Sequence, residues 1–335
     1  MPDLKDFHVD EEKVWFTGGY WPEGVPRQIY DVEGVEVLPL HEGMERQADK
    51  YELWDEHICL FALGPYIERI TYRDLWDKAK RFAAFLHDEC GVRKGDVVAI
   101  DLPNSPNFVI AYVATISLGA VVAGVNPQYK PMELLHELKI TDAKVLVMMD
   151  ALYLLIKNSL PKTNIEHLVS TNLLDFVTAP PEVFQKIRDN VPDFQDKVPD
   201  EVEHYGVHRM KQVIEETEAK EFEVDIDPWE DPACYLMTGG TTGLPKAAML
   251  THSNLYLNLK MMEPWTNLVP GMITIGSIPF FHSFGMTCVM NGSLALGMKM
   301  LLFPKPPPEE DLCTVVNQLE APEGIMYTGV EMLFK

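Results

Sequence analysis

The chain has 335 residues, 47% of them hydrophobic, and a formal net charge of −23 at pH 7. This length and apolar content exclude a disordered chain and fit either one large α/β domain or two of ordinary size. The acidic surface repels nucleic acids and anionic membranes, so a polyanionic ligand requires a local basic pocket. Residues 182–231 contain 16 acidic and 6 basic side chains, and we interpret this run as a solvated surface.

The amino-terminal sequence MPDLKDFHVDEEKVW has neither the basic start nor the apolar core of a signal peptide. The nearly apolar stretch 108–125 is interrupted by Ser117 and Gly119, which predicts a buried helix and a buried strand rather than a membrane span. None of the five cysteines forms a CxxC pair or a metal-binding spacing with histidine. We therefore predict buried free thiols in a cytoplasmic protein, and no metal ligands within this chain.

Strands and helices alternate from residue 67 to residue 149. A short strand leads to a helix that begins after Thr71, a suitable N-cap, and ends before Gly91. Next come a strand at 96–102, a helix at 106–119 that opens with proline and closes with glycine, and a strand at 120–125. An amphipathic helix at 131–143 and a strand at 144–149 follow. Because these strands are continuously apolar, we expect α/β architecture, with mostly parallel sheets flanked by helices on both faces.

The alternation of strands and helices stops at residues 178–230, and the five prolines and many charges of this stretch predict an irregular excursion over the surface. Order returns with strands at 233–237 and 247–250, followed by a helix that is capped by Thr251 or Ser253. Three further elements are predicted, namely strands within 271–280 and 298–304 and a helix within 306–320. The last helix has a proline-led start and an acidic first turn, which suit the helix dipole.

The loop between the strands at 233–237 and 247–250 has the sequence TGGTTGLPK and covers residues 238–246. Glycines let backbone N–H groups approach an anion, threonine hydroxyls add donors, and the lysine adds a positive charge. A glycine-rich hairpin turn is the simpler alternative, but it explains neither Lys246 nor the three threonines. We therefore predict a phosphate cradle.

This loop is not the P-loop of NTPases, although Lys246 lies at the matching distance from Gly240. Pro245 stands where that motif has its second glycine, and Ala247 stands where it has the magnesium-binding hydroxyl. A strand rather than a helix is predicted to follow. These three differences exclude the Walker type of site.

The stretch YLMTGGTTGLPKAAMLTH, residues 235–252, closely resembles the phosphate-binding signature of the adenylate-forming superfamily, whose usual form is close to YTSGTTGxPKG. Gly239 takes the usual serine position, and Ala247 takes that of the final glycine. The TGGTTG form is most similar to that of bacterial long-chain fatty acyl-CoA synthetases. Four other segments resemble that subgroup, namely WPEGVPRQI (21–29), VNPQYKPMELLHELKITDAKVLV (125–147), IPFFHSFG (278–285) and GIMYTGVEMLF (324–334).

The resemblance implies the amino-terminal domain of that superfamily, built from two interleaved α/β subdomains. It divides the chain into three parts. Residues 1–65 are an amino-terminal segment that packs with the second subdomain, residues 66–260 are the first subdomain with the phosphate loop 238–246, and residues 261–335 are the start of the second subdomain. The YGxTE motif with its magnesium-binding glutamate, the ribose-binding aspartate and the small lid domain with the catalytic lysine are absent from this sequence. We therefore expect the magnesium ligand beyond residue 335, and we expect this truncated span alone to be inactive.

The superfamily joins an acid to ATP, releases pyrophosphate, and then transfers the acyl group from acyl-AMP to CoA. The resemblance implies that the ATP phosphates bind seven residues of the loop: Thr238, Gly239, Gly240, Thr241, Thr242, Gly243 and Lys246. It places His282 between the nucleotide and acyl pockets, as a positioning residue rather than a general base. Three residues, Thr328, Gly329 and Val330, are candidates for the acyl-pocket wall, although an ordinary strand end explains them nearly as well.

The substrates implied by the resemblance are a fatty acid, ATP with magnesium, and CoA. The sequence gives no sign of a nucleic-acid partner or a transmembrane segment, and it leaves open a peripheral membrane contact and a homodimer. A second hypothesis is an aryl-CoA ligase or a carrier-protein-loading adenylation domain, both of which usually have serine where Gly239 stands. A third is a non-catalytic fragment that binds a nucleotide or a lipid, which ATP binding without pyrophosphate release would favour.

Overall fold

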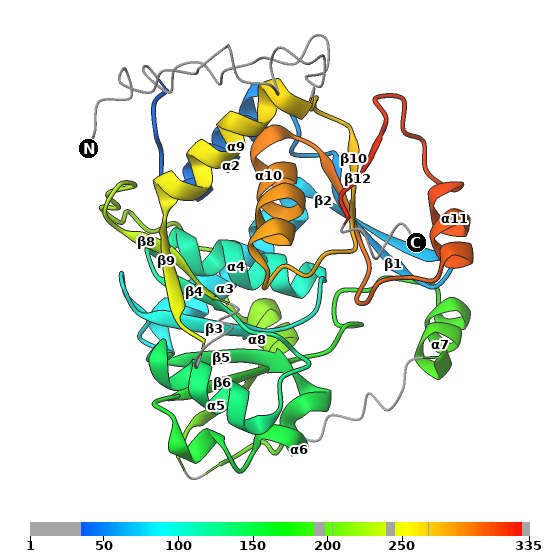
Figure 1. The fold of residues 1–335 in the computed structure, drawn as a ribbon. Coiled ribbons are helices and arrows are strands. Elements are labelled where there is room, and N and C mark those ends of the chain that lie inside the picture. Colours follow the sequence, from blue (N-terminus) through cyan, green and yellow to red (C-terminus); the bar gives the residue numbers. More distant parts are fainter. Residues whose placement is uncertain (1–34, 191–197, 203, 239–244, 267, 330–335) are drawn as a thin grey trace, which may run out of the picture.

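The computed structural model describes residues 35–190, 198–202, 204–238, 245–266 and 268–329. These residues form a seven-stranded and a five-stranded sheet with helices between and outside them (Figure 1). The expected α/β architecture of mostly parallel sheets flanked by helices is confirmed. Within the described residues, no helix has the length and apolar character needed to cross a membrane.

The seven-stranded sheet has the order β7–β6–β5–β3–β4–β8–β9 and is parallel except for the β8–β9 pair. Its strands are β3 (Val97–Asp101), β4 (Val121–Gly124), β5 (Val145–Met149), β6 (His167–Thr171), β7 (Gly206–Arg209), β8 (Pro232–Met237) and β9 (Ala247–Thr251). Residues on successive strand positions point to opposite faces, and both faces of this sheet are apolar and covered.

Helices cover both faces of the seven-stranded sheet. On one face lie α3 (Tyr72–Asp88), α4 (Pro106–Ser117) and α8 (Met210–Glu216). On the other lie α5 (Pro131–Ile140), α6 (Tyr153–Ile156) and short 3₁₀ turns at Asp150–Leu152 and Leu160–Lys162. Thr71 caps α3 as predicted, because its hydroxyl accepts a hydrogen bond from the Asp74 N–H at 3.1 Å. The stretch 108–125 forms the buried helix α4 and the buried strand β4, also as predicted.

The five-stranded sheet has the order β12–β10–β11–β1–β2 and combines both ends of the described chain. Its strands are β1 (His57–Leu63), β2 (Tyr66–Thr71), β10 (Ile273–Gly276), β11 (Lys299–Leu302) and β12 (Ile325–Tyr327). All neighbours are parallel except β1 and β2. The boundary that we expected between residues 65 and 66 falls within the β1–β2 hairpin, because β2 pairs with β1 and belongs to this sheet.

The described part of the segment 1–65 packs against residues later than 250. β1 lies beside β11, with Phe61 opposite Leu302, and α2 (Leu40–Lys50) packs on α9 (His252–Thr266) and α10 (Gly292–Leu296). The buried Leu40 N–H also donates to His252 Nδ1 at 3.0 Å. Residues 1–34, which include the WPEGVPRQI segment, lie outside the described residues.

A layer of helices lies between the two sheets and shares one continuous core with both. It contains α2, α3, α4, α9, α10 and a π-helical segment, Gly285–Asn291. The outer face of the five-stranded sheet packs against α11 (Glu309–Val316) in a separate small core (Figure 1). Thr251 caps α9, since its hydroxyl accepts from the Asn254 N–H at 3.2 Å.

The prediction of an irregular excursion over residues 178–230 is wrong for much of that stretch. It contains α7 (Pro181–Asn190), the edge strand β7 and the helix α8. Val207 pairs with Leu168 in the sheet, and Met210 and Ile214 are buried against the central core. The prolines and charges dominate the composition, but these few apolar residues at strand and helix spacing are enough to determine the packing.

Candidate functional site

The phosphate-loop candidate joins β8 to β9, as the sequence predicted for its position between two strands. Its two described ends, Thr238 and Lys246, form a neck. The Thr238 N–H donates to the Lys246 carbonyl at 2.8 Å, and the Thr238 hydroxyl lies 3.2 Å from the same oxygen. Both side chains are exposed, and Lys246 makes no ion pair with a described residue. A hydroxyl donor and an ammonium group at the rim of a loop suit a phosphate ligand.

Five of the predicted phosphate-binding residues lie outside the described residues: Gly239, Gly240, Thr241, Thr242 and Gly243. Their roles remain predictions. The described flank of the loop is held from α5, because the His136 ring donates from Nε2 to the Pro245 carbonyl at 2.9 Å. This contact connects the NPQYKPMEL region, residues 126–134, and the helix that it begins with the glycine–threonine loop.

The segment 278–285, which carries IPFFHSFG, lies against the carboxyl end of β4. A Cβ on Gly124, the last residue of β4, would lie 3.1 Å from Phe281 Cα. β4 is the parallel neighbour of β8, whose carboxyl end leads into the phosphate loop. The carboxyl edge of an open α/β sheet is where ligands usually bind, so the fold brings both predicted motifs to the expected edge.

Asn104 joins the two sheets directly behind this segment. Its buried amide donates to the carbonyls of Gly276 and Ile278 at 3.0 and 2.8 Å and accepts from the Phe280 N–H at 2.8 Å. Asn104 follows β3 of the larger sheet, whereas Gly276 ends β10 of the smaller one. Asn104 was not predicted as a functional residue, because in the sequence it is only a polar residue after an apolar strand.

His282 lies in a tight turn and is exposed. Its Nδ1 accepts from the Phe284 N–H at 3.2 Å, so the ring is already oriented by its own backbone. Gly285 is required here, since a Cβ would lie 2.3 Å from the Pro279 carbonyl oxygen. The π-helical segment begins at Gly285, and such segments are frequent at functional sites. These contacts fix the orientation of the ring, and the role of His282 remains a prediction.

The acyl-wall candidates follow β12, the edge strand beside β10. Thr328 and Gly329 are half-buried, and the Thr328 hydroxyl lies 3.5 Å from the Thr274 hydroxyl of β10. Val330 lies outside the described residues. β10 and β12 run parallel, so Thr328 and the segment after Gly276 lie at the same edge of the five-stranded sheet. The geometry brings Thr328 near the second motif, and the role of these residues remains a prediction.

Two buried carboxyl groups that were not predicted from the sequence lie between α5 and the seven-stranded sheet. Asp101 ends β3 on the face that α5 covers, and Glu137 is the next residue of α5 after His136. Burial raises the pKa of Asp101 to about 7. Burial, followed by the charge of Asp101, raises the pKa of Glu137 to about 8. A carboxylate three residues after the buried Leu134, on the apolar face of an amphipathic helix, was the available signal.

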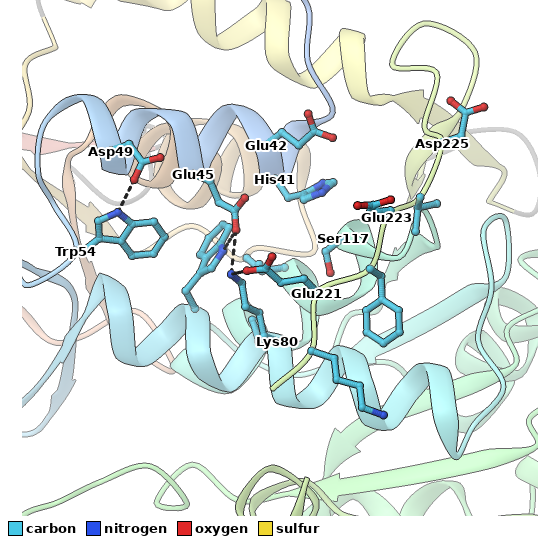
Figure 2. Close-up of a pocket in the computed structure, with 16 residues that line it drawn as sticks. His41, Glu42, Glu45, Asp49, Trp54, Lys80, Ser117, Glu221, Glu223 and Asp225 are labelled. Carbon is cyan, nitrogen blue, oxygen red and sulfur yellow. Dashed lines mark hydrogen bonds and ion pairs between the residues drawn. The ribbon is translucent and has the colours of Figure 1, made fainter. Parts of the chain in front are cut away.

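A pocket of about 790 Å³ lies between α2, α3 and residues 220–225 (Figure 2). Carboxylates dominate its lining: Glu42, Glu45, Asp49, Glu221, Glu223 and Asp225. Lys80 is paired with Glu221 at 2.8 Å and faces Glu45 at 3.6 Å. None of the predicted site residues lines this pocket, and its negative charge opposes both nucleotide phosphates and a fatty-acid carboxylate.

Replacing Asn104 with alanine is expected to lower the free energy of unfolding by about 2 kcal/mol, because three buried backbone groups lose a partner. Chemical denaturation monitored by circular dichroism measures this change. Asn164→Ala is the matched control, since Asn164 is exposed and bonds only Asp142 among the described residues. An equal loss in both variants would show that Asn104 does not hold the two sheets together.

A family model for AMP-binding enzymes matches residues 44–323, and the chain belongs to this family. The long-chain-fatty-acid–CoA ligase of Bacillus subtilis (strain 168) is 34% identical over 259 residues, which are 75% of this chain and 44% of that protein. The similar ligase of Salmonella typhimurium is 29% identical over 335 residues, or 96% of this chain and 55% of that protein. The chain thus spans about half the length of these curated relatives.

Solved structures show the same fold. The crystal structure of a long-chain-fatty-acid–CoA ligase from Archaeoglobus fulgidus matches with a TM-score of 0.68 and 24% identity, over 89% of this chain and 52% of that chain. At this level of identity the likeness establishes the α/β architecture, and the substrate has to be argued from the site.

Proposed function

We propose that the full-length protein is an AMP-forming long-chain fatty acid–CoA ligase. The observation that carries this proposal is the neck of Thr238 and Lys246, which lies at the same sheet edge as the segment 278–285. The family uses such a loop for the phosphates of ATP. The fatty-acid ligase from Bacillus subtilis, 34% identical over three quarters of this chain, supports the acyl substrate.

The described residues have distinct parts in the proposed reaction. Thr238 and Lys246 hold the phosphates, and Lys246 offsets the negative charge that develops on the leaving pyrophosphate. His282 positions the acid beside the nucleotide, and Thr328 lies at the acyl side. Magnesium would screen the phosphate charges, and the family resemblance places its carboxylate ligand beyond residue 335.

Two alternative functions would give different results in the activity test. An aryl-CoA ligase shares the fold, as shown by a benzoate CoA ligase from Burkholderia xenovorans LB400, with a TM-score of 0.69 at 15% identity. A non-catalytic nucleotide- or lipid-binding protein would retain the phosphate loop without turnover. We also propose that the present span alone is inactive, so both the span and the full-length protein have to be assayed.

The full-length protein is expected to release pyrophosphate from ATP and magnesium in the presence of a long-chain fatty acid, and to form acyl-CoA when CoA is added. Coupled pyrophosphate detection across fatty acids of increasing length, benzoate and 4-coumarate measures this. Preference for an aromatic acid would establish the aryl alternative. ATP binding by calorimetry without pyrophosphate release with any acid would favour a non-catalytic protein.

A further inference from the structure

Three potential metal ligands from distant parts of the sequence meet on one face of the seven-stranded sheet. They are Cys90, after the end of α3, His167, the first residue of β6, and His208, within the edge strand β7. Their ligand atoms all lie within 4.8 Å of one another. No metal-binding spacing is visible in the sequence, because 76 residues separate Cys90 from His167 and the cluster exists only after the sheet has formed.

The two imidazole rings face each other with one nitrogen each, at hydrogen-bond distance. His167 Nδ1 lies 3.1 Å from His208 Nε2. Two nitrogens that share a tetrahedral Zn²⁺ at the usual bond length of about 2.0–2.1 Å are separated by about 3.3 Å. The nitrogen pair is therefore close to the separation that one shared ion requires, and the thiol, within 4.8 Å of both nitrogens, has to approach to about 3.5 Å to complete three ligands.

Gly206 provides the space for this arrangement. It lies opposite His167 in the β6–β7 register, two residues before His208 on the same face. A Cβ on Gly206 would lie 2.9 Å from both His167 Nδ1 and His208 Nε2. An alanine there would retain all three ligands and fill the space between them.

The surroundings hold the ligands in place. Phe85 packs edge-on against the His208 ring, with ring centroids 4.8 Å apart, and Cys90 is buried. The Cys90 N–H donates to the Phe85 carbonyl at 3.2 Å, which anchors the thiol to the end of α3. Two exposed acidic residues, Glu89 and Glu166, directly precede ligands, and the Lys144 ammonium, which donates to the Gly91 carbonyl at 2.8 Å, is the positive charge beside the cluster.

We propose that Cys90, His167 and His208 form a Zn²⁺ site that clasps α3 to the edge of the seven-stranded sheet. The thiol releases one proton on binding, and each histidine keeps its remaining ring proton on the nitrogen that does not face the metal. One thiolate and two imidazoles suit zinc, and water completes the fourth position. His167 begins β6 and its register partner Gly206 begins β7, whereas the phosphate loop follows the carboxyl end of β8, so the site lies away from that loop and the ion would tie α3 to β6 and β7.

The tag-free chain, stripped of metal with a chelator and then given ZnCl₂ alone, is expected to bind one zinc ion by calorimetry. Its melting temperature should rise by a few degrees at a hundredfold excess of zinc over the dissociation constant. Co²⁺ in place of zinc should show a thiolate charge-transfer band. Cys90→Ser should abolish that band, and Gly206→Ala should weaken zinc binding at least tenfold with all three ligands present.

Two variants serve as controls. Cys313→Ser removes an exposed thiol and His57→Gln an exposed imidazole, and both should bind zinc as the unaltered chain does. If Cys90→Ser does not fold, His208→Gln provides the ligand test instead. No zinc binding by the unaltered chain, or full binding retained by Gly206→Ala and a ligand variant, would overturn the proposal.

Discussion

Replacing Lys246 with alanine in the full-length protein is expected to slow adenylation by about a hundredfold, the usual effect of losing one preorganised contact to developing charge. The ammonium group stands at the neck of the loop, where Thr238 hydrogen-bonds the Lys246 backbone. Alanine keeps that backbone contact and removes only the charge. Thioester formation from pre-made acyl-AMP should continue at the original rate, because pyrophosphate has already left.

Measuring the two half-reactions separately distinguishes a role of Lys246 in chemistry from a role in structure. Pyrophosphate release measures adenylation, and acyl-CoA formation from synthetic acyl-AMP measures thioester formation. Lys157→Ala is the matched control, because Lys157 is an exposed lysine next to α6. Equal loss in both half-reactions would mean that Lys246 supports the fold, and the phosphate-cradle interpretation would be withdrawn.

Replacing Glu137 with glutamine is expected to raise the free energy of unfolding at pH 8 by on the order of 3 kcal/mol and to change it little at pH 4. Burial and the Asp101 charge raise the pKa of Glu137 from 4.5 to about 8. Between these values the folded protein binds more protons than the unfolded chain. The unaltered protein therefore loses stability as pH rises through this range, and glutamine removes that loss.

Urea denaturation at several pH values measures this dependence. Glu215→Gln is the control, since Glu215 is an exposed residue of α8. Asp101 remains in the Glu137 variant, and burial also raises its pKa to about 7, so part of the pH dependence should persist. A Glu137 variant that is as sensitive to alkaline pH as the unaltered chain would contradict the assignment.

The elements that the sequence predicted well carry their signal locally. The strands of the seven-stranded sheet from β3 to β5 and the helices between them are apolar runs bounded by proline, glycine and capping residues. The Gly- and Thr-rich loop was identified for the same reason, since its chemistry lies within nine consecutive residues.

The features that the sequence did not reveal depend on contacts between distant segments. Asn104 holds backbone groups some 170 residues away, and the rings of His167 and His208 meet only because β6 and β7 pair. The burial of Glu137 was not predicted for a different reason, because a charged residue on an amphipathic helix is normally assigned to the solvent side. Local patterns carry no information on such pairings.

The pairing of β1 with β11 has a consequence for synthesis on the ribosome. β1 can pair with its parallel neighbour β11 only after Leu302 has been synthesised, about 240 residues after Phe61. At a translation rate of about 5–20 residues per second, the wait is roughly ten to fifty seconds. During that time β1, whose residues 58–63 are all buried in the finished protein, presents an apolar unpaired edge. The nascent β1–β2 hairpin therefore stays open to other strands until β11 has been synthesised.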